Sequence, residues 1–241
     1  MLSRRCSLSA LFLVLSTAAL PQQESVTSAV EAYMREHGVT GATVAIGQNG
    51  KMVYERAFGM ADIEHDVRAT TSTVYRLASI SKSITAVAVM QLVEAGKVKL
   101  DEDARTYVPE FPQKENRFTV RDILCHQSGI RHYKQNEPPG VKRYTSVADS
   151  LEVFSGDPLL HEPGTKYGYS THAYTILARL VEIASGMSFR EYLKSQLFKR
   201  AGMETTDIED QQTIVKHRSR GYRKGSDGLL NSPFEDISYK Q

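Results

Sequence analysis

Apolar residues fill the stretch from Ile84 to Val93, where only Thr85 and Gln91 are polar. A helix that is apolar on nearly every side is typical of an element buried all round, not of one lying on a surface. Gly96 supplies a stop signal after it. The pattern therefore predicts a buried helix through the middle of its domain.

Further helices are predicted from apolar periodicity, cap residues and stop signals. They are residues 25–37 ending at Gly38, 120–126 between a Thr119 cap and Gly129, 146–154, 173–184 ending at Gly186, and 189–200 after a Ser188 cap. Residues 131–144 are polar and contain Pro138-Pro139-Gly140, which indicates a surface excursion.

Strand patterns occur in two pairs. Residues 42–47 and 52–58 flank Asn49-Gly50, a strong hairpin signal, and residues 221–223 and 229–231 bracket a turn containing two glycines. The first pair predicts that an antiparallel sheet opens the domain.

Length and composition indicate an ordinary globular protein. The 241 residues suffice for one sizeable domain or two small ones, and 41% hydrophobic with 24% charged residues is ordinary for a globular protein. The net charge of +2 comes from Arg4 and Arg5. The remaining chain has no basic stripe of the kind that nucleic acid requires, so nucleic acid is not an expected partner.

Residues 1–20 have the features of a secretory signal peptide. Arg4 and Arg5 precede a mostly apolar run from Leu8 to Leu15, and small residues allow cleavage near Ala19. The run is short for a membrane span, so no integral span is expected after its removal. We predict an exported protein whose single domain covers residues 24–241. A mitochondrial presequence is the alternative, since the leader contains Arg and Ser and no acidic residue.

Cys125 is the single cysteine outside the leader, so no internal disulfide is expected. The adjacent Cys125-His126 pair has no partners at metal-ligand spacing. It is interpreted as a buried thiol beside a hydrogen-bonded histidine, and no metal or cofactor is predicted.

Candidate chemistry lies at the start of the central helix. Ser79 and Lys82 are three residues apart, which places them on one helical face. A serine hydroxyl needs a base, and burial near a helix N-terminus lowers the pKa of a lysine towards that role. The Ser79 N–H would also point at a developing oxyanion. The alternative is a plain helix start with Ser79 as N-cap and Lys82 reaching solvent, because Ser-x-x-K alone is a weak motif.

Several longer motifs occur in one order along the chain. They are Arg-Leu-Ala-Ser-Ile-Ser-Lys-Ser at 76–83, Thr-Val-Arg-Asp-Ile-Leu-Cys-His-Gln-Ser-Gly-Ile at 119–130 and Pro-Gly-Thr-Lys-Tyr-Gly-Tyr-Ser at 163–170. Together they resemble the serine beta-lactamase and penicillin-binding-protein superfamily, in its class C beta-lactamase-related branch. Residues 107–112, 129–133 and 236–240 resemble the mitochondrial serine beta-lactamase-like proteins and their bacterial relatives within it.

The resemblance implies an α+β, beta-lactamase/transpeptidase-like fold with a helix-flanked antiparallel sheet and an all-helical region. It implies Ser79 as the acylated nucleophile, Lys82 as its proton acceptor and Tyr169 as a partner in acid–base work. Tyr169 is otherwise a packed aromatic, and Tyr144 and Tyr167 are its nearby rivals. Thr171 stands where much of the superfamily has Asn, so we expect it to bind substrate polar groups with a single hydroxyl.

The third motif of the superfamily, a Lys-Thr-Gly or His-x-Gly strand, does not occur in the 241 residues. The resemblance therefore implies the N-terminal part of the fold, without its C-terminal strands. Three hypotheses follow. The first is a serine hydrolase that forms an acyl-enzyme on a small-molecule or peptide substrate (a peptide, ester or lactam). The second is a catalytically inactive truncated domain that binds a cell-wall or protein partner, and the third is an unrelated globular domain. The sequence predicts neither the natural substrate nor an oligomeric state.

Overall fold

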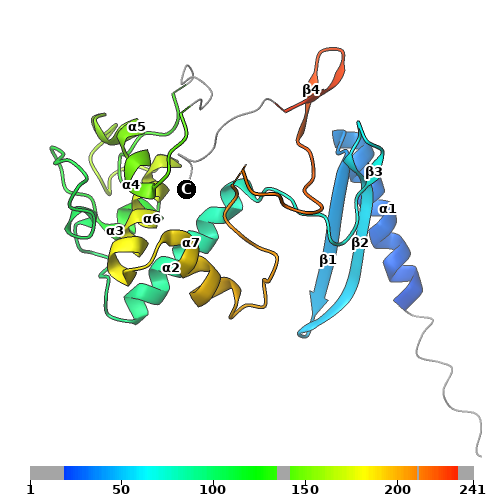
Figure 1. The fold of residues 1–241 in the computed structure, drawn as a ribbon, viewed down its shortest axis with the longest axis horizontal. Coiled ribbons are helices and arrows are strands. Elements are labelled where there is room, and N and C mark those ends of the chain that lie inside the picture. The colour runs from blue at the N-terminus through cyan, green and yellow to red at the C-terminus, as the bar shows by residue number, and fades with distance from the viewer. Residues whose placement is uncertain (1–18, 135–141, 211, 233–241) are drawn as a thin grey trace, which may run out of the picture. The chain divides into compact units, whose positions relative to one another are not determined.

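The computed structural model of the protein describes residues 19–134, 142–210 and 212–232 (Figure 1). The chain forms two compact units, which we call the sheet unit (described residues 19–75 and 215–232) and the helical unit (described residues 76–134, 142–210 and 212–214). The separation of antiparallel strands from a helical region confirms the predicted α+β class. Most of the predicted leader, half of the 131–144 excursion and the 236–240 motif lie outside the described residues.

The sheet unit begins with helix α1 (Ala19–His37), which starts six residues before the predicted Ser25. Strands β1 (Gly41–Gln48), β2 (Lys51–Asp62) and β3 (Val67–Arg68) follow as an antiparallel sheet in the order β1-β2-β3, and β4 (Tyr222–Gly225) pairs with β5 (Gly228–Asn231). Both predicted hairpins are confirmed. Asn49 and Gly50 have φ of 51° and 73°, as a tight two-residue turn between twisted strands requires. β3 is an additional neighbour of the first hairpin.

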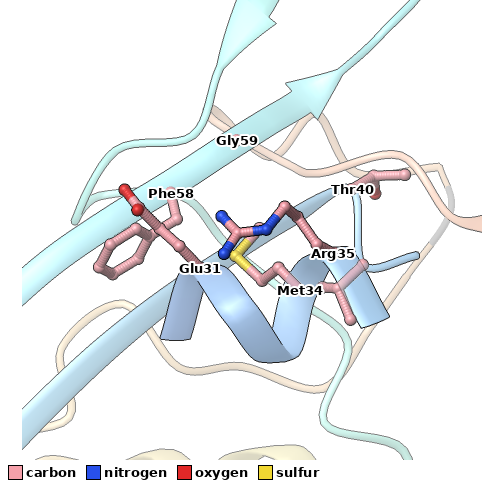
Figure 2. A pocket seen from close by; sticks show the side chains of 7 residues that line it. Glu31, Met34, Arg35, Thr40, Phe58 and Gly59 are labelled. Carbon is pink, nitrogen blue, oxygen red and sulfur yellow. The ribbon is translucent and has the colours of Figure 1, made fainter. Parts of the chain in front are cut away.

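A hollow in the sheet unit lies between α1 and the strands (Figure 2). Glu31, Met34 and Arg35 of α1 line it together with Thr40, Phe58 and Gly59. Gly59 has φ of 68°, and a Cβ there would lie 2.2 Å from the Thr40 carbonyl oxygen. Only glycine fits at this position of β2, where the backbone comes close to the residue that precedes β1.

The helical unit consists of short and medium helices around one core. They are η1 (Ala78–Ile80), α2 (Ser81–Glu94), η2 (Ala104–Thr106), α3 (Val120–Leu124), α4 (Val147–Ser150), α5 (Glu152–Ser155), α6 (His172–Ser185), α7 (Phe189–Tyr192) and the π-helical turn η3 (Leu193–Phe198). The predicted helices 146–154 and 189–200 are each divided into two pieces. The helix predicted at 120–126 stops at Leu124, because His126 turns into the left-handed region with φ of 57°.

The helix buried on most sides is α6, and the prediction that α2 is buried all round is wrong. α6 buries nine of its residues, from His172 to Val181, whereas α2 buries Thr85, Ala88, Val89 and Leu92. Val87 and Met90 of α2 are 49% and 39% exposed. Among the described elements, α2 packs mainly against α6 and to a lesser extent against η3, so its apolar sequence exceeds what these contacts cover.

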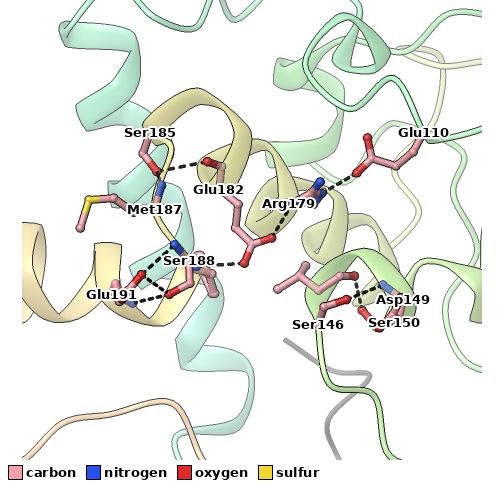
Figure 3. Close-up of polar contacts among 12 residues, drawn as sticks. Glu110, Ser146, Asp149, Ser150, Arg179, Glu182, Ser185, Met187, Ser188 and Glu191 are labelled. Carbon is pink, nitrogen blue, oxygen red and sulfur yellow. Dashed lines mark hydrogen bonds and ion pairs between the residues drawn. The ribbon is translucent and has the colours of Figure 1, made fainter.

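Local polar contacts fix the helix ends as predicted. Ser188 forms a reciprocal capping box with Glu191, and Thr119 forms another with Asp122. Figure 3 shows the Ser188–Glu191 contacts beside Arg179, which binds both Glu110 and Glu182. These interactions lie on and beside α6 and hold its neighbours in place.

Arg131, at the start of the predicted surface excursion, is buried instead of exposed. Its guanidinium donates to the Asp157 carboxylate and to the carbonyls of His132 and Val153. Lys134 donates to the same carboxylate. A buried cation is stable only when it is paired and hydrogen-bonded, so Asp157 anchors this segment.

We expect Asp157→Asn to lower the free energy of unfolding by roughly 3 kcal/mol, because it removes the carboxylate that pairs with the buried Arg131. Hydrogen bonds from Lys134 and Arg131 lower the pKa of Asp157 below its ordinary 3.8. The wild-type contribution is therefore complete above pH 3.8 and is lost as the pH falls through the lower folded pKa. Urea unfolding at pH 7 and at low pH measures both effects.

Asp101→Asn is the matched control, since Asp101 pairs with Arg121 on the surface with both side chains more than half exposed. An exposed pair contributes about 0–1 kcal/mol. Equal losses for the two variants would contradict the anchoring role of Asp157.

Candidate active site

Ser79 lies in η1, the single turn that leads into α2. The residue before it, Ala78, has φ of 46°, a backbone conformation that L-residues avoid and that occurs at functional turns. Ser79 is exposed and makes no side-chain cap, and Ile80 is the N-cap residue of α2. The alternative of Ser79 as an N-cap is therefore wrong, and the turn presents its hydroxyl to other side chains.

Lys82, in the first turn of α2, reaches the Ser79 hydroxyl. Its Nζ donates to Ser79 Oγ at 3.4 Å and to Thr171 Oγ1 at 3.1 Å. The ammonium also lies 5.0 Å from the centre of the Tyr169 ring and 5.7 Å from that of Tyr174. Lys82 is half-buried, so the alternative of a lysine that reaches freely into solvent is wrong.

Tyr169 makes the shorter contact with the serine. It lies in the loop before α6, and its hydroxyl donates to Ser79 Oγ at 2.8 Å. Burial raises the pKa of Tyr169, but hydrogen bonds with Lys82 and Ser79 and the Lys82 charge outweigh this and lower the pKa below its ordinary value. The Tyr169 oxygen therefore lies within hydrogen-bonding distance of Ser79 Oγ, and its pKa is lowered.

The two rival tyrosines lie elsewhere. Tyr167 is 62% exposed and packs edge-on against His126. Tyr144 faces Lys142, which pairs with Glu152, and the pKa of Tyr144 is raised by burial and by that carboxylate.

Thr171 completes the polar cluster around Lys82. Its hydroxyl accepts from Lys82, and its backbone N–H donates to His132 Nδ1 at 3.3 Å. The four residues named from the sequence, Ser79, Lys82, Tyr169 and Thr171, therefore form one connected group although two of them lie about 90 positions further along the chain.

Two histidines of this cluster carried no role in the sequence-based prediction. His126 Nδ1 accepts the Ser170 N–H at 3.2 Å, which confirms a hydrogen-bonded histidine, whereas the expectation of a buried Cys125 thiol is wrong because that thiol is exposed. His132 accepts the next N–H along, that of Thr171. Both lie within motif segments, but neither has the spacing of a metal site or a triad.

A group of Asp62, Glu64 and His65 in the sheet unit has ligand atoms within 4.8 Å of one another. Glu64 is engaged by Arg220 and Asn231, and Asp62 by His65, so protein groups already satisfy these carboxylates. Over the described ranges, which omit residues 1–18, no helix is long and apolar enough to cross a membrane.

The arrangement of a serine, a lysine one helical turn later and a tyrosine on a facing loop defines the class of protein. The chain belongs to the Beta-lactamase family, whose sequence profile matches residues 26–238, within the serine beta-lactamase and penicillin-binding-protein superfamily. It is 32% identical over 275 residues to the human (Homo sapiens) "Serine beta-lactamase-like protein LACTB, mitochondrial", an alignment that covers 85% of this chain and 50% of LACTB.

A bacterial relative, "Protein flp" of Staphylococcus aureus strain MRSA252, is 26% identical over 216 residues, which cover 88% of this chain and 43% of flp. The chain thus spans about half the length of the curated relatives it matches. Among solved structures, "EstCE1, a hydrolase with promiscuous acyltransferase activity" superposes with a TM-score of 0.80 at 21% identity, over 90% of this chain and 61% of EstCE1. These matches confirm the predicted superfamily and the beta-lactamase/transpeptidase-like fold.

Proposed function

We propose that the protein is a serine hydrolase that acts through an acyl-enzyme on Ser79. The observation that carries the proposal is the double contact to one oxygen, because Tyr169 Oη and Lys82 Nζ both reach Ser79 Oγ. A serine hydroxyl requires such a partner to lose its proton during attack. Membership of the Beta-lactamase family supports the same chemistry.

In the proposed acylation step, Tyr169 Oη as phenolate takes the Ser79 proton while Oγ bonds to the substrate carbonyl carbon. In this step Lys82 is an ammonium that stabilises the phenolate through its charge, and the transferred proton stays on Tyr169 until the leaving group takes it. The proton then passes from Tyr169 to the leaving group as the acyl–heteroatom bond breaks. A water molecule, deprotonated by the same tyrosine, hydrolyses the ester on Ser79 and returns the hydroxyl.

The substrate class that we propose is a small ester, amide or lactam with a reachable carbonyl. Thr171 carries a single hydroxyl, whose oxygen already accepts a hydrogen bond from Lys82. A substrate therefore meets one hydroxyl at this position in place of the carbonyl and amino groups of an amide. EstCE1 is a hydrolase with promiscuous acyltransferase activity, which supports an acyl acceptor other than water as well. Export after removal of residues 1–20 stays a prediction, and the mitochondrial location of the relative LACTB supports the alternative.

Covalent labelling tests the proposal. The native protein is incubated with a fluorophosphonate and, separately, with a labelled penicillin, and the modified peptide is identified by mass spectrometry. We expect one label per chain, on Ser79, from at least one of the probes, and none after heat denaturation. A protein with a cooperative melting transition that takes no label from either probe would contradict the proposal and favour the inactive binding domain.

A further inference from the structure

Two histidines accept hydrogen bonds from consecutive backbone N–H groups of the segment that carries Tyr169. His126 Nδ1 accepts from Ser170 at 3.2 Å, and His132 Nδ1 accepts from Thr171 at 3.3 Å. These N–H groups precede α6, where a chain has no intrahelical acceptors for its first donors. The imidazoles therefore supply acceptors that the helix itself lacks.

The same two rings contact the Tyr169 side chain. The His126 ring centre lies 4.5 Å from that of Tyr169 in a tilted arrangement, and the His132 ring lies 5.3 Å away, nearly perpendicular. Backbone and side chain of the tyrosine segment are thus held by one pair of residues. Such contacts restrict both the position of the loop and the direction of the Tyr169 ring.

The histidine pair is itself held in place. Ser170 Oγ donates to the Arg131 carbonyl at 2.7 Å and accepts the Ala173 N–H at 3.0 Å. Arg131 is buried and bound to Asp157, so the stretch between the two histidines cannot shift without breaking that ion pair. The loop before α6 rests on a rigid support.

We propose that His126 and His132, in their neutral forms, are positioning residues that fix Tyr169 against Ser79. The catalytic consequence rests on the function proposed above, whereas the placement of Tyr169 does not. We call the two hydrogen bonds that His126 and His132 accept from Ser170 and Thr171 the clamp. An imidazole accepts a hydrogen bond only through an unprotonated nitrogen, so each of these bonds is lost when its ring takes a second proton.

The surroundings of His126 oppose its protonation. The groups around His126 are Lys82 from α2, Tyr174 from α6, Tyr167 and Tyr169 from the loop, and the neighbouring Cys125 and His132. The partners of His132 include Tyr133 and Tyr169. Burial, then the charge of Lys82 and then His132 lower the pKa of His126. The hydrogen bond that His126 accepts from Ser170 therefore persists at neutral pH and is lost in acid, below the ordinary histidine pKa of about 6.5.

Comparing asparagine with leucine at the histidine positions separates the effect of losing the hydrogen-bond acceptor from the effect of losing the ring. Asparagine places Oδ1 near the site of Nδ1, carries no charge at any pH and tolerates the positive φ of residue 126. Leucine at 132 has similar bulk and no acceptor. We expect His132→Leu to slow labelling of Ser79 about 100-fold, the effect of a misplaced catalytic group, and His132→Asn to stay within about threefold. His126→Asn should stay within the same range and lose its share of the acid inactivation.

His37→Leu is the control, since His37 lies on α1 in the sheet unit and contacts Tyr33. It should label at the native rate. Cooperative thermal melting of every variant verifies the fold. Equal labelling rates for His132→Leu and the native protein, or unaltered acid inactivation in the His126→Asn, His132→Asn double variant, would overturn the proposal.

A second measurement does not depend on turnover. The phenolate absorbance of Tyr169, taken as the difference between titrations of the native protein and Tyr169→Phe, reports the pKa of that tyrosine. His132→Leu should move it up towards the ordinary value of about 10, because the ring leaves Lys82, whereas His132→Asn should not. An unchanged pKa in His132→Leu overturns the clamp. If the native protein takes no label, the proposed function fails while this titration still decides the placement of Tyr169.

Discussion

Ser79→Ala is expected to abolish covalent labelling and to lower hydrolysis by a factor on the order of 10⁵ to 10⁶ in kcat, the loss found when a serine nucleophile is removed. The oxygen that receives hydrogen bonds from Tyr169 and Lys82 is the group that would attack the carbonyl. The fold should survive, because Ser79 is exposed and its side chain caps no helix. Intact mass after probe treatment and the melting temperature measure the two effects.

Ser83→Ala provides the matched control one helical turn along the chain, at an exposed residue of α2. It should label and turn over like the native protein. A label that persists in Ser79→Ala, or one that disappears equally in Ser83→Ala, would move the nucleophile elsewhere.

Tyr169→Phe is expected to lower the labelling rate by about 10² to 10⁴, the contribution of a positioned acid–base group. Its pKa is lowered because hydrogen bonds with Lys82 and Ser79, and the Lys82 charge, outweigh burial. The reactive form is the phenolate, so the native rate should rise with pH up to this lowered pKa, below the ordinary 10.0. That alkaline rise should be absent from the phenylalanine variant.

Tyr167→Phe, two residues earlier in the same loop, tests whether any tyrosine here matters. Its ring is exposed and contacts His126 by the edge, which phenylalanine preserves. We expect a native pH profile. A similar loss in both variants would assign the effect to the loop and not to the Tyr169 hydroxyl.

Local chemistry accounts for what the sequence predicted well. Asn49-Gly50 imposes its turn, Thr119 and Ser188 cap their helices, and Gly186 ends α6 with φ of 73°, each through contacts within a few residues. Ser79 and Lys82 are likewise one turn apart. Tyr169 was selected by resemblance alone, since its contact with Ser79 spans 90 positions and depends on tertiary packing.

The same reasoning explains the errors. Hydropathy indicates that α2 prefers burial, but the number of elements packed around a helix decides the outcome, and α6 is the one surrounded. Cys125 follows α3, which buries Val120 and Ile123, and is still exposed, at the point where the chain turns at His126. The roles of His126 and His132 depend on which backbone N–H groups lie opposite their rings, which no spacing rule encodes.

The backbone conformation of Ala78 affects both the thermal stability of the protein and the orientation of Ser79. A left-handed backbone costs an alanine about 1–2 kcal/mol, and glycine adopts it freely. Glycine at position 78 would raise the melting temperature and, in the same step, widen the range of directions open to the neighbouring serine. Selection for a higher melting temperature alone would therefore favour glycine at position 78, at the expense of the proposed hydrolysis by Ser79.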